Sequence, residues 1–182
     1  GIRATHTEFG GRVKAGFTGV SDGNGTNDCM GHGTHVAGTI GSATWGVAKN
    51  VSLVPVRVFG CSGSTTWSTV LAGIDWVIND HKAGVPAVAN MSLGGGYSGI
   101  VNAGVAKGIA DGITFAVAAG NSNVDACSTS PASEPTAITV GAVASNDWRA
   151  SFSNYGTCVD LFAPGQSITS TWYTGDTATA SL

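Results

Sequence analysis

Short apolar runs alternate along the chain with longer segments in which apolar residues recur every three or four positions. The apolar runs are rich in Val, Ile and Ala, which predicts buried strands. The helical spacing predicts helices over Thr69–Lys82 and Ile100–Ala110, and Gly112 suits the end of the second helix. The predicted strands are Val51–Phe59, Ala87–Leu93, Ile113–Ala119 and Ala137–Val143.

The order of these elements predicts an α/β fold. Strands that are continuously apolar are buried on both faces, so we expect a parallel β-sheet with helices on both faces. Ligands of such sheets bind beyond the carboxyl ends of the strands. The sequence shows no internal repeat, linker or low-complexity segment, so we expect a single domain over residues 1–182.

Composition narrows the range of partners. Hydrophobic residues make up 42% of the chain and charged residues only 10%, and the 28 glycines predict a compact fold with many tight turns. A formal net charge of −3 gives no electrostatic basis for binding nucleic acid or an anionic membrane. No apolar run approaches the roughly 18–20 residues of a membrane-spanning helix. We therefore expect neither nucleic acid nor a membrane as a partner.

The chain has four cysteines, which allow three pairings into disulfides. Pairing in sequence order would close two loops of similar length. No two cysteines have the close spacing of a zinc half-site, which argues against zinc, whereas four buried thiols remain an alternative. Two disulfides would indicate an oxidising compartment. The four are Cys29, Cys61, Cys127 and Cys158.

A candidate catalytic base lies in Gly31–Thr39, a stretch of small residues that predicts a helix beginning at His32. The helix dipole disfavours an imidazolium at a helix N-terminus, which keeps such a histidine neutral and able to accept a proton. A histidine that only packs is one alternative. His32 and His35 could also form a metal pair, although no neighbouring Glu or Cys completes a zincin pattern.

Two further segments follow predicted strands. Gly120 and Asn121 would place an amide at the ligand-binding edge of the sheet, where it could donate a hydrogen bond to an oxyanion, although these two residues taken alone are better explained as a plain turn. Gly94–Gly99 spells the G-x-G-x-x-G pattern of dinucleotide-binding folds. The next strand, however, ends at Asn121 instead of the acidic residue that would bind a ribose. The alternative is that this Gly-rich backbone hydrogen-bonds an extended peptide.

Several separated segments together resemble the subtilase family of serine proteases, and in particular its proteinase K-like branch. The family's motifs for the catalytic histidine, the substrate-binding strand and the oxyanion asparagine are similar to Gly31–Gly38, Ser92–Gly96 and Ala118–Asn121. Ser130–Pro135 and Ser151–Gly156 also match. The resemblance covers essentially the whole chain and implies a subtilisin-like three-layer fold, truncated at both ends.

The resemblance implies a serine endopeptidase that uses a Ser-His-Asp triad. His32 would be the general base, and the amide of Asn121 would donate to the oxyanion. In this family the aspartate would precede Gly1 and the serine would follow Leu182, so we expect residues 1–182 to be a partial catalytic domain, inactive alone. A catalytically inactive binding protein of the same family is the alternative.

The resemblance also implies how protein and peptide substrates bind. Two backbone segments would pair with an extended substrate, and small residues would line the pocket for the side chain before the scissile bond. None of these positions is acidic, so we expect broad specificity with a preference for apolar or aromatic residues. The implied substrate-binding residues are Ser62, Gly63, Ser64, Trp67, Ser92, Leu93, Gly94, Ala118, Ala119 and Gly120.

Relatives with this cysteine spacing pair the first cysteine with the second and the third with the fourth. The resemblance therefore implies the disulfides Cys29–Cys61 and Cys127–Cys158. It further implies a secreted, extracellular protein that acts as a monomer and is made with its own pro-segment.

Calcium is the cofactor that the resemblance implies, in a structural and not a catalytic role. The carbonyl oxygens of Pro135 and Ala137 and the carboxylate of Asp160 match the family's strong site. Calcium favours such hard oxygen ligands. A solvated surface acid is the alternative interpretation of Asp160. The oxygen-rich loop Asp22–Asp28 could hold a second ion, although a plain turn is the simpler prediction.

Overall fold

A computed structural model describes all residues, 1–182, and the chain divides into two compact units. The first unit comprises Gly1–Gly73 and Ile168–Leu182, and the second comprises Ile74–Ser167. The boundary falls within helix α2, Trp67–Asp80. No helix combines the length and the apolar character needed to cross a membrane.

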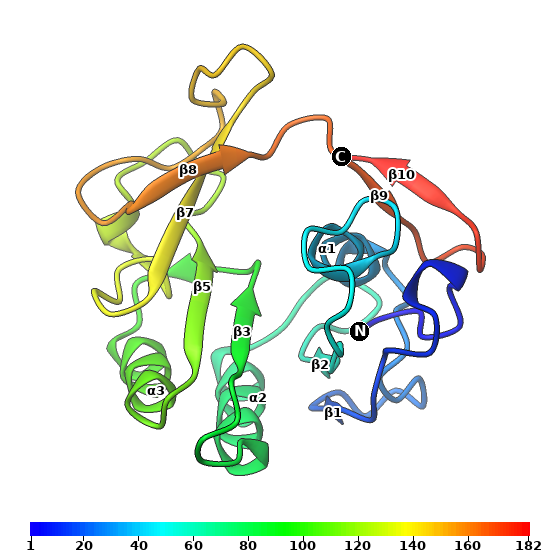
Figure 1. The fold of residues 1–182 in the computed structure, drawn as a ribbon. Helices are drawn as coiled ribbons and strands as arrows, with labels where there is room; N and C mark the ends of the chain where they lie inside the picture. Colours follow the sequence, from blue (N-terminus) through cyan, green and yellow to red (C-terminus); the bar gives the residue numbers. More distant parts are fainter. The chain divides into compact units, whose positions relative to one another are not determined.

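The second unit is built on a parallel four-stranded sheet with the strand order β3-β5-β7-β8. Each neighbouring pair is parallel, and Figure 1 shows the four strands side by side. Helix α3 connects β3 to β5, and the short strands β4 and β6 pair antiparallel beside the sheet. The bounds are β3 Val88–Met91, β4 Gly95–Gly96, α3 Gly99–Ala110, β5 Thr114–Ala118, η2 Ala126–Ser128, β6 Thr129–Ser130, β7 Ile138–Val143 and β8 Leu161–Pro164.

The sequence pattern explains this arrangement. Val101 and Val105 are fully buried on α3, and Phe115 and Val117 are buried at alternate positions of β5. Gly108 lets α3 approach this strand, because a Cβ there would lie 2.5 Å from the Phe115 ring. The predicted helix and the three strands of this unit are therefore confirmed to within a few residues at each end.

The first unit contains helix α1 and two small sheets. β1 pairs parallel with β2, whereas β9 and β10 form an antiparallel hairpin that packs on α1. Ser170 and Thr171 donate their hydroxyl groups to helix carbonyls, and Gly38 leaves them the space, because a Cβ there would lie 2.2 Å from Thr171 Oγ1. The bounds are η1 Thr7–Phe9, β1 Phe17–Thr18, α1 His32–Gly41, β2 Val56–Arg57, β9 Thr169–Thr171 and β10 Thr179–Ser181.

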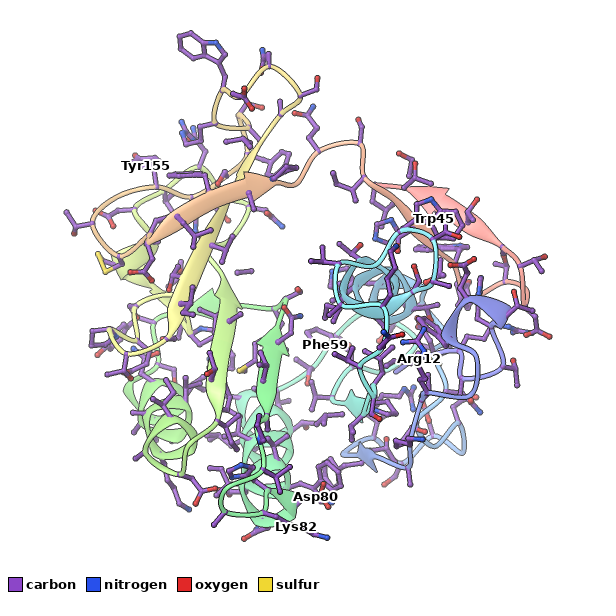
Figure 2. The ribbon with its side chains drawn as sticks, viewed as in Figure 1. Arg12, Trp45, Phe59, Asp80, Lys82 and Tyr155 are labelled. Atoms are coloured by element: carbon purple, nitrogen blue, oxygen red, sulfur yellow. A yellow bond between two sulfur atoms is a disulfide. The ribbon has the colours of Figure 1, made fainter.

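A single arginine ties the start of this unit to the end of α1. Its guanidinium donates to three backbone carbonyls in different segments, and its side chain is labelled in Figure 2. These bonds run from Arg12 to the oxygens of Glu8, Gly41 and Val51.

One predicted strand is much shorter than expected. Of Val51–Phe59 only Val56–Arg57 is a strand, and Leu53 makes an isolated bridge to Val13. Pro55 lies between the two and has no N–H to give to a ladder, which explains the interruption.

Candidate active site

His32 is the first residue of α1, and its side chain is exposed. The preceding Gly31 has φ 107° and packs against Trp172, where a Cβ would lie 2.3 Å from the ring. Only glycine fits both the backbone conformation and the contact. No hydrogen bond within the chain engages the His32 ring, so both ring nitrogens are available to other groups.

The carboxylate of Asp28 caps this helix. Its Oδ1 accepts hydrogen bonds from the backbone N–H groups of Met30 and Gly31, at 2.9 and 2.8 Å. Its Oδ2 accepts from Thr34 N at 2.8 Å and from Thr34 Oγ1 at 2.6 Å. Burial raises the pKa of Asp28, but the hydrogen bonds from Gly31 and Thr34 outweigh it and lower the pKa overall. Asp28 therefore stays ionised and satisfies N–H groups that a helix start leaves unpaired.

The local electrostatics favour a neutral His32. Partial removal from solvent lowers its pKa even though the residue is exposed, and the charge of Asp28 opposes this only in part. His35 is different, because it is buried and its Nε2 lies 2.9 Å from the carbonyl oxygen of Ile168. Its ring also meets the Trp172 ring edge-on. His35 is thus held by the fold, which leaves it no free nitrogen at Nε2 for a metal pair with His32.

The second unit has a cavity of about 390 Å³ beyond the carboxyl ends of β3 and β5. This is the sheet edge at which the sequence predicts ligand binding. Seven predicted residues line the cavity: Ser92, Leu93, Gly94, Ala118, Ala119, Gly120 and Asn121. Gly95 and Gly96, which belong to the predicted substrate-binding segment Ser92–Gly96, also line it. Four more residues line it for which the sequence predicts no contact with substrate: Ser122, Thr129, Ser130 and Asn154.

Asn121 lies at this cavity with its side chain exposed. Gly120 precedes it with φ 106°, a conformation that favours glycine. No hydrogen bond within the chain uses the Asn121 amide, so the amide is free to donate to a bound group.

Asn154 is one of the lining residues for which the sequence predicts no contact with substrate. It is buried, and its amide bonds to the segment that carries Asn121. The segment Ser151–Gly156 had been singled out as a motif, but nothing in the sequence indicates what its asparagine contacts.

The remaining predicted substrate residues lie in or beside the first unit's own cavity, of about 330 Å³. Ser62 and Ser64 line it, and their hydroxyl oxygens are 2.8 Å apart. Gly63 lies between them with φ 77°, and Trp67 begins α2 half-buried. Neither Gly63 nor Trp67 is among the residues that line this cavity.

Both disulfides are present with the predicted pairing, and the Cα–Cα distances are 5.2 Å for Cys29–Cys61 and 5.3 Å for Cys127–Cys158. Arg57, 2% exposed, donates to both oxygens of Asp22 and to the sulfur of Cys29. The hydrogen bonds from Arg57 hold the pKa of Asp22 well below its usual range.

The loop Asp22–Asp28 is better explained as a turn than as an ion site. One of its acids pairs with Arg57 and the other caps α1. The carboxylate of Asp22 does lie near the sulfurs of Cys29 and Cys61, but those sulfurs are bonded to each other and are not metal ligands.

The predicted calcium ligands lie near the adjoining ends of β7 and β8. Asp160 precedes β8, and its Oδ2 accepts from Thr139 N at 2.7 Å while its own N donates to Thr139 O at 2.9 Å. Its carboxylate is exposed, and its Oδ1 accepts no hydrogen bond. Pro135 and Ala137 precede β7 and offer carbonyl oxygens. An all-oxygen set with an exposed carboxylate fits the chemistry of calcium.

The α/β sheet and these motifs define a subtilisin-like protein. The subtilase family, Peptidase_S8, matches residues 1–181, and the chain belongs to this family. The chain is 58% identical over 182 residues to an extracellular serine proteinase of Thermus sp. (strain Rt41A). This match covers 100% of the chain and 44% of that protein. The chain is also 54% identical over 181 residues to the alkaline serine exoprotease A of Vibrio alginolyticus. This second match covers 100% of the chain and 34% of that protein.

Solved structures agree with this assignment. The crystal structure of a cold adapted subtilisin-like serine proteinase matches with a TM-score of 0.94 and 53% identity, over 100% of this chain and 65% of that one. The predicted fold class is therefore confirmed, and the Gly-rich segment Gly94–Gly99 belongs to a subtilase and not to a dinucleotide-binding fold. The chain spans less than half the length of the curated relatives named above.

Proposed function

We propose that residues 1–182 are part of the catalytic domain of a secreted serine endopeptidase. The observation that carries the proposal is the match to the subtilase family over residues 1–181. His32 and Asn121 lie in the segments whose sequences resemble the family's motifs for the catalytic histidine and the oxyanion asparagine. The two disulfides support an extracellular location, as does the relative whose name calls it extracellular.

In this mechanism His32 takes the proton of a serine hydroxyl as the serine attacks the peptide carbonyl, and then gives it to the leaving amine. The lowered pKa of His32 suits the first step, because only the neutral ring accepts a proton. Asn121 donates its amide N–H to the oxyanion of the tetrahedral intermediate. The serine and the aspartate of the triad are proposed to belong to parts of the protein outside residues 1–182.

The substrates are proteins and peptides, with an apolar or aromatic residue before the scissile bond. The cavity of about 390 Å³ supports this preference, because its lining has small, apolar and uncharged polar residues and no acid that would select a basic side chain. Ser92–Gly94 would pair with the substrate backbone, and Ser62–Ser64 and Trp67 would contact residues further from the scissile bond.

Calcium is proposed as a structural ion on Pro135, Ala137 and Asp160. The exposed Asp160 carboxylate with an oxygen free of hydrogen bonds supports the site. We further expect the protein to act as a monomer, to be made with its own pro-segment, and to need neither nucleic acid nor a membrane.

The test uses the full protein and two internally quenched peptides that differ only in Phe or Lys before the scissile bond. We expect a higher kcat/KM for the Phe peptide, and a fluorophosphonate probe should label one serine. His32→Ala should lower kcat by roughly 10⁶-fold, a magnitude known from subtilisin itself and not from this structure.

His81→Ala is the matched control. The His81 ring pairs with Asp111 and with the carbonyl of Val85 and is not among the residues that line either cavity, so this variant should keep full activity. A full protein that binds the Phe peptide without cleaving it, and that the probe does not label, would instead be an inactive binding relative.

A further inference from the structure

We propose that Asn154 is a positioning residue for the oxyanion donor: its buried amide holds the segment Ala119–Val124 so that Asn121 presents its own amide at the cavity. This inference rests on the proposed endopeptidase function and assigns a role to a residue that does not itself touch the reacting atoms.

Asn154 bonds to the segment on both sides of Asn121. Its Nδ2 donates to the carbonyl oxygen of Ala119 at 2.8 Å. Its Oδ1 accepts from the backbone N–H groups of Ser122, at 3.0 Å, and Val124, at 3.2 Å. Asn154 is 1% exposed, so water does not compete for these bonds. One carboxamide thus bonds to residues on both sides of Asn121.

The backbone reinforces the same contact. Asn154 N donates to the carbonyl oxygen of Gly120 at 2.9 Å. A Cβ on Gly120 would lie 2.4 Å from Asn154 Nδ2, so glycine is required for the carboxamide to fit. On the following residue, Tyr155, which is labelled in Figure 2, the N–H donates to Val124 O at 3.1 Å.

Asn121 makes no hydrogen bond of its own that would fix its side chain, although Asn123 N also donates to Phe152 O at 2.9 Å. Its side chain is exposed and forms no hydrogen bond within the chain, so its position depends on the backbone that Asn154 holds. An oxyanion donor works only if it is already in place when charge develops on the substrate. A displacement of about 1 Å can cost roughly 10²-fold in rate.

A purely structural role for Asn154 is the competing explanation, and Asn102 provides the matched comparison. Asn102 is the other buried asparagine of this unit, at 8% exposure, and its Nδ2 donates to Ser133 Oγ at 2.9 Å. It does not line the cavity. Asn→Asp at either position removes one donor and buries a carboxyl group, but only at Asn154 does this affect the segment that carries Asn121.

The experiment measures kcat, KM and the melting temperature of the full protein carrying Asn154→Asp or Asn102→Asp. Aspartate keeps the acceptors for Ser122 and Val124 but sets an oxygen against the carbonyl of Ala119. We expect Asn154→Asp to lower kcat by about 10–10²-fold with KM within about 3-fold. Asn102→Asp should lower the melting temperature and leave kcat unchanged. If Asn154→Asp does not fold, Asn154→Ser, which shortens the side chain, replaces it with the same expectation.

The second measurement repeats Asn154→Asp in an Asn121→Ala background. Once the donor is absent its position no longer matters, so the further loss in kcat should be under about 3-fold. An undiminished loss in that background, or a lowered melting temperature with unchanged kcat, would overturn the positioning role while wild type still cleaves the peptide. If wild type itself cleaves nothing, the proposed function fails and this role with it.

Discussion

Asp28 shows how one side chain positions the proposed general base, His32, without itself touching a substrate. Its four hydrogen bonds, two from the residues just before α1 and two from Thr34 in the first turn, fix the backbone at Gly31 and therefore the starting point of the His32 side chain. The carboxylate also favours the charged form of His32, against the effect of partial burial. Removal from solvent is the largest cause of the lowered His32 pKa, and Asp28 is the group that opposes it.

Replacing Asp28 by Asn should destabilise the protein in a pH-dependent way. Asn keeps the shape but loses the charge at a helix N-terminus, and its Nδ2 would face donor groups from which a carboxylate oxygen of Asp28 now accepts, so we expect about 1–3 kcal/mol at neutral pH. The folded-state pKa of Asp28 is lowered, so its contribution is complete above the unfolded value of about 3.9 and is lost as pH falls through the folded value. Urea unfolding of wild type and variant at pH 7 and at pH 3 measures this difference.

Asp147→Asn is the control for that experiment. Asp147 lies in a turn with φ 63°, which Asn also adopts readily, and its carboxylate has no hydrogen bond in the structure. Its effect on stability should be small at both pH values. A destabilisation by Asp28→Asn that is as large at pH 3 as at pH 7 would contradict the assigned role of the charge.

Residues with a local signature could be predicted from the sequence, and residues with distant partners could not. His32 and Asn121 lie in short motifs whose spacing carries the information. Asn154 acts on Ala119, which is 35 positions away, and only the folded loops bring them together. The sequence shows Asp28 only as part of an oxygen-rich loop that could hold an ion. Its capping role becomes visible only once the start of α1 is known.

At the scale of elements, the sequence predicts those helices and strands whose buried apolar residues recur at a regular spacing. β5, β7 and α3 carry apolar residues at the spacing of a buried strand or helix, and the structure confirms them. The hairpin of β9 and β10 was not predicted, because its residues are mainly Thr, Ser and Ala and are held by hydroxyl groups against α1. Such a hairpin has no apolar alternation for a sequence pattern to detect.

The disulfide Cys127–Cys158 joins η2 to the segment just before β8. It closes a loop of 31 residues, so the loop-entropy relation gives about 3–4 kcal/mol for the bond. We expect the double variant Cys127→Ser, Cys158→Ser to lose stability by about this amount in guanidinium unfolding. The full protein with both bridges intact is the reference, and an unchanged unfolding midpoint would show that the bond constrains nothing in the unfolded chain.

A bound calcium ion is predicted near the adjoining ends of β7 and β8. If Asp160, Pro135 and Ala137 hold an ion, binding stabilises the folded state by mass action, so excess chelator should lower the melting temperature of the full protein. Asp160→Asn should already melt lower and respond much less to chelator, whereas Asp147→Asn should respond as wild type does. If chelator lowers the melting temperature of wild type and of Asp160→Asn equally, Asp160 does not bind the ion.

At the scale of the whole molecule, the single domain predicted from the sequence stays a proposal, since the chain divides into two compact units. The boundary at Gly73 and Ile74 falls inside α2, so neither unit contains a complete copy of this helix. Helix formation is cooperative, and loss of one half removes support from the other. The units are therefore expected to unfold together.

This expectation is tested by calorimetry on the full protein carrying His32→Ala, which prevents self-digestion during heating. One transition, with equal calorimetric and van't Hoff enthalpies, is the expected result. The same scan with Gly73→Pro provides a sharper test, because a proline in the middle of α2 should cost about 3 kcal/mol and lower that single transition as a whole. Two separate transitions, only one of which moves in the proline variant, would show instead that the units are independent domains joined by α2.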